Sequence, residues 1–286
     1  MADPTTAVMS FQAGEAQVIR DLKPRDATTL KDLGYKVQWA DGNMYVLCPD
    51  SKPGTGSPFI DPKVREAVEY AIDKEEMVDS FGYGFWEAQY EAAPTSRPAA
   101  YVPGLAERKY DPDKAKQLLA DAGYPDGFDT TIYAQVSDDR EVLTAIQSYL
   151  ADVGINAKID VAEPAKFMEQ GAKGWVNGLR YYYPGVDMDF RSAFNAFYSA
   201  DAGAHFMAMD KPVNMTDAIR EANETVDSAK VKELMQYATK QLYDNALVIP
   251  LWTNSIICAM DDTVHDCDIA TIDIHRWHAA PIWLSK

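Results

Sequence analysis

The sequence predicts an α/β fold in which a mixed sheet is flanked by helices. Three observations carry this prediction: two helices with clear start signals, a strand–helix–strand pattern over 128–161, and an amphipathic helix over 226–244. The chain has 286 residues, of which 47% are apolar and 25% charged, so it is long enough to bury the core that such a fold needs.

The first well-marked helix is predicted to begin after Asp61, which acts as N-cap, with Pro62 at the first helical position. The apolar residues of one face recur at helical spacing: Val64, Ala67, Val68, Ala71 and Ile72. Asp73 followed by Glu76 is a second start signal. The chain is therefore expected to turn and begin another helix there.

Asp111 and Pro112 mark a further helix in the same way, and Gly123 ends it. Its apolar face consists of Ala115, Leu118, Leu119 and Ala122. Near the other end of the chain, the pattern over 226–244 predicts a long helix with one apolar face, and the run 246–252 predicts a buried strand directly after it.

Residues 128–136 alternate between apolar and polar side chains, which is typical of a strand, and 155–161 alternate in the same way. Between them, Ser137 is expected to cap a helix that Gly154 ends. A strand–helix–strand unit of this length predicts two parallel strands joined by a right-handed connection.

The remaining segments have weaker patterns. A short helix is expected at 7–11 and an extended stretch at 44–47, before a cluster of proline, glycine and serine at 49–58 that predicts a loop or hinge. Residues 81–103 are expected to be irregular, and the tail 262–286 shows no periodicity.

The formal net charge is −17, from 44 acidic and 27 basic residues. Nucleic acid and anionic membrane surfaces are therefore not expected as partners, because binding phosphate needs a basic face.

No stretch has the length and apolarity of a transmembrane helix, and no signal peptide opens this chain. The spacing of Cys48, Cys258 and Cys267 matches no zinc motif; Cys258 and Cys267 could pair, whereas three free, buried thiols are the simpler expectation.

Two long motifs resemble a known family. Residues 61–74 read DPKVREAVEYAIDK, and 110–124 read YDPDKAKQLLADAGY. Both resemble elements of the extracytoplasmic solute-binding proteins of ABC importers, of the oligopeptide, dipeptide and nickel type known as family 5. Gln12–Glu15 and Ala246–Leu251 are weaker likenesses to the same family.

The resemblance implies a periplasmic-binding-protein-like fold of type II, represented here by the later portion of a longer chain. The expected organisation is a partial first-lobe segment with the hinge at 1–58, a second α/β lobe at 59–250 and a return segment to the first lobe at 251–286. Taken alone, this chain is expected to bind ligand weakly or not at all, because part of the enclosing lobe is missing.

The resemblance also implies a function: capture of a peptide or another small polar solute in a cleft between two lobes, for delivery to ABC permease subunits. It further implies an extracytoplasmic location, as a periplasmic protein or a cell-surface lipoprotein held by an N-terminal anchor that this chain lacks, and a monomeric state. No catalytic residue, cofactor or metal is expected.

Peptide-binding members of this family use an aspartate shortly after a tryptophan to pair with the ligand ammonium. The comparable stretch here begins at Arg180 and has three tyrosines in place of tryptophan, so a ligand other than a peptide stays open. Asp187 is the candidate partner for a cationic ligand group. The predicted ligand contacts, taken from three separated loops near strand ends, are Phe85, Trp86, Arg180, Tyr181, Tyr182, Tyr183, Asp187 and Trp252.

Two alternatives come from other classes of protein. A sensory or regulatory ligand-binding module with the same fold would share every feature above. A hydrolase is less favoured, because none of the four histidines lies beside a recognisable nucleophile motif. His275 and His278 have a spacing that can bind a metal on a helix, but their segment has no helical pattern.

Overall fold

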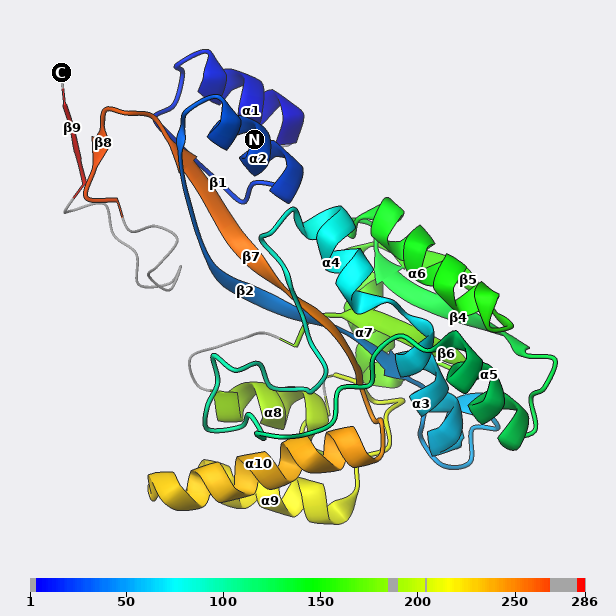
Figure 1. Ribbon diagram of the computed structural model, residues 1–286. Coiled ribbons are helices and arrows are strands. Elements are labelled where there is room, and N and C mark those ends of the chain that lie inside the picture. Colours follow the sequence, from blue (N-terminus) through cyan, green and yellow to red (C-terminus); the bar gives the residue numbers. More distant parts are fainter. Residues whose placement is uncertain (1–3, 185–189, 204, 268–281, 286) are drawn as a thin grey trace. The chain divides into compact units, whose positions relative to one another are not determined.

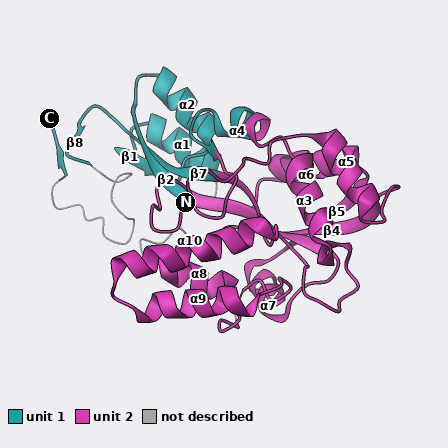
Figure 2. Ribbon diagram, turned by 60° about the horizontal axis from the view of Figure 1, so that its bottom comes forward, with its two compact units in different colours: residues 1–42, 78–87, 253–286 teal, residues 43–77, 88–252 magenta. Residues whose placement is uncertain are grey.

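The computed structural model describes residues 4–184, 190–203, 205–267 and 282–285 (Figure 1). Contacts divide the chain into two compact units (Figure 2). Unit 1 comprises Met1–Gly42, Val78–Glu87 and Thr253–Lys286, and unit 2 comprises Asn43–Met77 and Ala88–Trp252.

Helices and strands are interspersed along the chain. The helices are α1 (Pro4–Gln12), α2 (Pro24–Asp32), η1 (Pro58–Ile60, a 3-10 turn), α3 (Pro62–Ala71), α4 (Lys74–Gly82), α5 (Pro112–Asp121), α6 (Arg140–Asp152), α7 (Pro164–Lys173), α8 (Phe190–Tyr198), α9 (Val213–Glu224) and α10 (Ser228–Asp244). The strands are β1 (Val18–Arg20), β2 (Lys36–Pro49), β3 (Glu87–Ala88), β4 (Phe128–Gln135), β5 (Ile155–Ala162), β6 (Gly178–Tyr182), β7 (Ile249–Met260), β8 (Val264–His265) and β9 (Trp283–Leu284).

The sheet of unit 2 is mixed. Strand β6 lies between β2 and β4, and β5 follows β4 at the edge. β4 pairs in parallel with both β5 and β6, whereas β2 pairs antiparallel with β6. Helix α6, which joins β4 to β5, packs on β5 and on α3, and α3 packs on α5. The predicted strand–helix–strand unit with parallel strands is confirmed, as is the mixed α/β class.

A helical layer forms the rest of unit 2. α8 packs on α9, and α9 packs on α10 (Figure 2). Their apolar faces meet residues of β2 in one buried cluster whose largest members are Trp175, Phe194, Phe197, Tyr198 and Phe206. Burying this apolar area supplies the main driving force for folding this layer.

Unit 1 has its own small core. β1 pairs antiparallel with the distal part of β7, from Val18–Met260 to Arg20–Cys258. The apolar side chains come from α1, α2, the residue Leu22 before α2, the segment that includes Phe85, and β7. They are Phe11, Leu22, Ala27, Leu30, Phe85, Ile257 and Ala259.

The helix start signals are confirmed by the N-cap hydrogen bonds. The Asp61 carboxylate accepts from the backbone N–H of Lys63 at 2.8 Å, and Asp73 accepts from that of Glu76 at 3.0 Å. Asp111 accepts from the N–H of Lys114, also at 3.0 Å. Each cap satisfies a backbone donor that the first helical turn leaves without an intrahelical acceptor.

Two boundaries were predicted wrongly. Ser137 does not cap α6; Asp139 does, accepting from the N–H of Glu141 at 3.0 Å, because a tight turn after β4 delays the helix by two residues. The apolar strand begins at Ile249 rather than 246, because Ala246 has a φ of 43° and belongs to the turn that ends α10.

Several elements have no strong sequence signal. α7, α8 and α9 were not predicted, and β2 extends well beyond the expected stretch 44–47. The compact units also differ from the expected lobes in detail, since 43–58 belong to unit 2 and 78–87 to unit 1. The assignment of 1–58, 59–250 and 251–286 to two lobes stays a prediction.

Gly127 and Gly123 offer a matched test of the turn that precedes β4. Both have positive φ, but a Cβ on Gly127 would lie 1.8 Å from the carbonyl oxygen of Gly154, whereas one on Gly123 would meet nothing within 4 Å. Gly123→Ala is expected to cost about 1–2 kcal/mol for its left-handed backbone alone. Gly127→Ala should have this same backbone cost and lose about 1–3 kcal/mol more of the free energy of unfolding through the clash with Gly154. Urea unfolding of both variants measures the difference, and equal losses would contradict the close approach.

Candidate functional site

The carboxyl ends of β4 and β6 form the candidate site of unit 2. These two strands are parallel, so their ends, Gln135 and Tyr182, lie at the same edge of the sheet. Ligands of open α/β sheets bind outside the carboxyl ends of parallel strands. The residues that follow β4 and β6 are therefore the first to consider.

The three consecutive tyrosines separate onto the two faces of the sheet. The ring of Tyr181 stacks on Tyr45 of β2 at 5.1 Å and lies 6.3 Å from Trp252 of β7. The ring of Tyr182 instead contacts Phe167 of α7 at 5.4 Å. This is the alternation with a period of two that a strand imposes.

Tyr183, just beyond the strand, connects the two sets of rings. It stacks on Tyr182 at 4.9 Å and lies 5.3 Å from Tyr45. Tyr45, Tyr182 and Tyr183 remain partly exposed, so this edge offers phenol rings and hydroxyl groups to a ligand. Tyr45 was not predicted, because its place beside Tyr181 depends on the pairing of β2 with β6.

Arg180 lies on the same face as Tyr182 and is only 1% exposed. Its guanidinium stacks over the ring of Phe167 at 3.5 Å, and a Cβ on Gly171 would come within 2.9 Å of Nη2. Neither Nη1 nor Nη2 has a hydrogen-bond acceptor in the part of the chain that the structure describes. Burial lowers the pKa of Arg180 to about 10, which still leaves the group charged at neutral pH. A buried cation without an acceptor is costly, so this group is suited to receiving an anion.

Asp138 provides the opposite charge at the same edge. It follows β4, and its carboxylate accepts a hydrogen bond from the backbone N–H of Gln135 at 2.7 Å. Burial raises its pKa to about 6, while this hydrogen bond and the charge of Arg180 act in the opposite direction. Sequence reasoning missed Asp138, although an acidic residue just after a parallel strand could have indicated it.

The other predicted contacts lie elsewhere. Phe85 and Trp86 pack in the core of unit 1, where Phe85 meets Trp39 edge-on at 5.2 Å. Trp252 is fully buried in unit 2 behind Tyr45 and Tyr181. Asp187 lies outside the described residues, as do His275 and His278.

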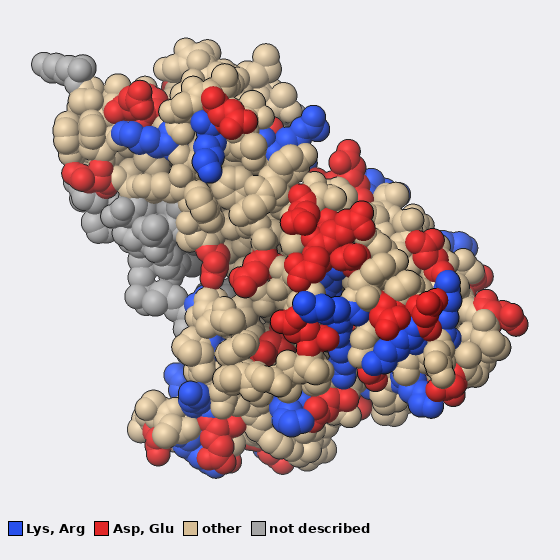
Figure 3. Space-filling model, in the orientation of Figure 1, with Lys and Arg blue, Asp and Glu red and all other residues tan. Residues whose placement is uncertain are grey.

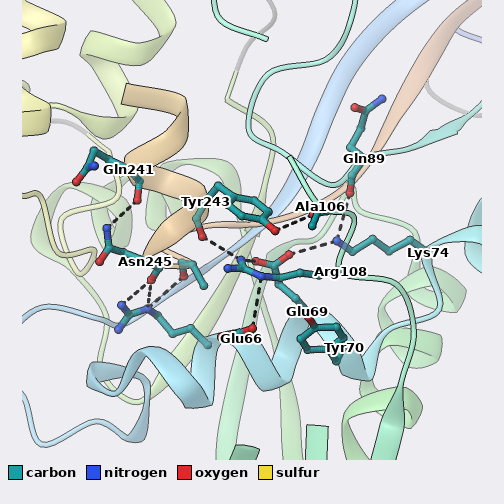
Figure 4. A network of polar contacts seen from close by, with 12 residues as sticks. Glu66, Glu69, Tyr70, Lys74, Gln89, Ala106, Arg108, Gln241, Tyr243 and Asn245 are labelled. Atoms are coloured by element: carbon teal, nitrogen blue, oxygen red, sulfur yellow. Dashed lines mark hydrogen bonds and ion pairs between the residues drawn. The ribbon is translucent and has the colours of Figure 1, made fainter. Parts of the chain in front are cut away.

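A second polar cluster in unit 2 is a buried ionic network (Figure 4). Arg108 donates from Nη1 to Glu69 Oε1 at 2.7 Å and to the carbonyl of Tyr243 at 2.9 Å. Lys74 Nζ lies 3.7 Å from Glu69 Oε2 and donates to the carbonyl of Gln89 at 3.2 Å. Burial lowers the pKa of Lys74 to about 8, against the opposing effect of Glu69. Because the charges within this network compensate one another, we assign it to the fold rather than to a ligand.

Some acidic side chains on the surface accept hydrogen bonds from other residues of the protein. On the face drawn in Figure 3, acidic side chains gather around α4. Glu75 and Glu76 at the start of this helix accept hydrogen bonds from the hydroxyls of Tyr90 and Tyr149. Among the described residues, no group of three or more His, Cys, Asp or Glu side chains could hold a metal ion, and no helix is long and apolar enough to cross a membrane.

The fold and the sequence together identify the class of protein. The family model described as bacterial extracellular solute-binding proteins, family 5 middle, matches residues 1–205. Since the match covers more than half of the chain, the chain belongs to this family. The expectation drawn from the two helix motifs is thereby confirmed.

Individual relatives agree with this assignment. The chain is 29% identical over 271 residues to the glutathione-binding protein GsiB of Escherichia coli K12, a match that covers 91% of this chain and 52% of GsiB. The chain therefore spans about half the length of the curated relatives it matches.

Solved structures show the same fold, that of type II periplasmic binding proteins. The periplasmic binding protein DppA from Helicobacter pylori, in complex with the peptide STSA, has a TM-score of 0.84 at 21% identity, over 100% of this chain and 56% of DppA. A dipeptide-binding protein from Pseudoalteromonas sp. SM9913, in complex with Met-Leu, has a TM-score of 0.81 at 20% identity, over 100% of this chain and 57% of that protein.

Arg108→Met tests the structural assignment of the ionic network. It leaves Glu69, which is 1% exposed, without its 2.7 Å partner, so the free energy of unfolding should fall by about 3–5 kcal/mol. Lys173→Met removes the exposed partner of Glu169 and should leave the free energy of unfolding nearly unchanged, because solvent screens this pair. Denaturant unfolding of the two variants compares them, and losses of similar size would show that the network does not stabilise the fold.

Proposed function

We propose that this chain forms the solute-capturing part of the receptor of a bacterial ABC importer. It binds its ligand without changing it and presents it to the permease subunits from an extracytoplasmic location, as a monomer. Membership of the solute-binding family supports this role. The relatives named for glutathione, a peptide and a dipeptide support a ligand of similar chemistry.

The ligand in this proposal is a zwitterionic, peptide-like solute. The single observation that carries it is the pair of opposite charges at the carboxyl edge of β4 and β6. Arg180 has two guanidinium nitrogens without an acceptor among the described residues, and the carboxylate of Asp138 accepts a hydrogen bond from the backbone N–H of Gln135. A solute with one carboxylate and one ammonium group complements both charges.

The tyrosines between these charges complete the proposed site. Tyr45, Tyr182 and Tyr183 are partly exposed and would contact the body of the ligand, whereas Tyr181 is only 4% exposed and holds Tyr45 in place by stacking. Aromatic walls with few polar groups are typical of small-molecule sites. Ligand contacts by Phe85, Trp86, Trp252 and Asp187 remain predictions from the sequence.

The guanidinium is covered by its neighbours, so the ligand carboxylate has to displace a side chain to reach it. Tyr182 and His205 are partly exposed and lie beside it. Tyr182 partly opposes the effect of burial on the pKa of Arg180, and burial together with the charge of Arg180 lowers the pKa of His205. Their rings lie 6.4 Å apart. We propose that one of them moves when the ligand binds.

Asp138→Asn tests the ammonium contact. Calorimetry of the intact protein with Met-Leu should show the tightest binding between about pH 7 and about pH 8, where Asp138 is ionised and the ligand still carries its ammonium group. Binding should weaken as the pH falls through the pKa of Asp138, about 6, because only the carboxylate pairs with an ammonium. Asp138→Asn should weaken binding at neutral pH by about ten- to a hundred-fold, the equivalent of about 1.5–3 kcal/mol, and abolish the pH dependence.

Two controls make this test specific. Asp139→Asn changes the neighbouring charge but keeps a residue that caps α6 well, so it should preserve both affinity and pH dependence. N-acetyl-Met-Leu lacks the ammonium and should bind the parent protein and the Asp138→Asn variant equally weakly. Failure of Met-Leu, glutathione and other zwitterions to bind at all would contradict the proposed ligand class.

Arg180→Met tests the carboxylate contact by separating binding from stability. Arg180 is buried and has no ion-pair partner in the part of the chain that the structure covers, so replacing it by an apolar side chain of similar length should leave the fold as stable or make it more stable by about 1 kcal/mol or more. The variant should nevertheless lose discrimination between Met-Leu and its C-terminal amide. A large loss of thermal stability, or unchanged discrimination, would show that Arg180 is a structural residue.

A further inference from the structure

Two of the three cysteines belong to one small buried cluster in unit 1. Cys258, near the end of β7, and Cys267, after β8, are 1% and 4% exposed. They share this cluster with Met260 and Val264, and Val18 and Ile282 pack against it. Cys48 lies elsewhere, in the core of unit 2.

The chain between the two cysteines turns back on itself. The backbone N–H of Val264 donates to the carbonyl of Asp261, and the Asp261 carboxylate accepts from the N–H of Thr263 at 2.9 Å. This turn ends β7 and starts β8, so it returns the following residues to the end of β7. Cys267 therefore reaches the cluster that contains Cys258 although a turn and a strand separate them.

Cys267 also acts on the thiol of Cys258. Burial raises the pKa of Cys258 to about 11, and the neighbouring Cys267 adds to this effect, because two thiolates side by side would repel. The thiol of Cys258 donates a weak hydrogen bond to the carbonyl oxygen of Gln38 at 3.6 Å, and a disulfide sulfur has no proton to donate in this way. Both cysteines are free thiols in the structure.

We propose that Cys258 and Cys267 form a reversible dithiol–disulfide pair, which in its oxidised form fixes the segment after β7 to the strand itself. Disulfides form and persist in oxidising compartments. The inference thus rests on the extracytoplasmic location in the proposed function, but not on the ligand site in unit 2.

The oxidant is a disulfide of low molecular mass, such as oxidised glutathione, or the disulfide of a thiol oxidase. One cysteine thiolate attacks a sulfur of oxidised glutathione, which releases one glutathione thiolate and leaves a mixed disulfide. The second cysteine thiolate attacks the protein sulfur of that mixed disulfide and releases the second glutathione. The protein loses two protons and two electrons, and the products are one internal disulfide and two molecules of reduced glutathione.

Incubation of the purified chain with oxidised glutathione tests the pair. After denaturation, alkylation and mass spectrometry, we expect one alkylated thiol, that of Cys48, and one proteolytic fragment that links Cys258 to Cys267. Cys48→Ala should form the same link. Because the thiolate fraction of Cys258 rises with pH below its pKa of about 11, the link should form faster at pH 9 than at pH 7.

Thermal unfolding with and without a reducing agent provides the second measurement. The oxidised chain should unfold at a higher temperature than the reduced chain, because the disulfide restricts the unfolded state. The double variant Cys258→Ala/Cys267→Ala should show no effect of the reducing agent. Three alkylated thiols, glutathione on both cysteines or a link to Cys48 would each overturn the proposal, and none of these results would alter the test of ligand binding with Asp138→Asn.

Discussion

The position of β6 inside the sheet is the constraint on which the candidate site depends. Because β6 lies between β2 and β4, every side chain along it points to one covered face or the other, with a period of two. Arg180 is therefore buried against α7, Tyr181 is buried against Tyr45 and Trp252, and only the end of the strand reaches the surface. A shift of one residue in the pairing with β2 would exchange these environments.

The buried charges of unit 2 have two different kinds of surroundings. In the network of Arg108, Glu69 and Lys74, opposite charges meet within the fold, and backbone carbonyls take up further donors. Within the described ranges of the chain, Arg180 has aromatic rings near its guanidinium and no acceptor for Nη1 or Nη2, and Asp138 has a raised pKa of about 6. Charges that the fold compensates fully stabilise it, whereas charges that it compensates only in part are available to a ligand.

Much of the fold could be predicted from the sequence because its signals are local. The caps at Asp61 and Asp111, and the alternation that defines β4 and β5, depend on residues a few positions apart. The site could be predicted only in part. Arg180 and the three tyrosines were found through their resemblance to a family stretch, whereas Tyr45 and Asp138 join them through strand pairing and burial, which no local pattern encodes.

The pKa of the Asp138 carboxyl group in the free and the ligand-bound protein reports directly whether a ligand ammonium binds beside it. Carbon-13 NMR of aspartate-labelled protein, with the signal assigned by its loss in Asp138→Asn, follows this group through a pH titration. We expect a pKa of about 6 in the free protein and a clear fall when Met-Leu binds, because an ammonium beside the carboxylate favours its ionised form. An unchanged pKa in the complex would show that the ligand ammonium does not bind at this edge of the sheet.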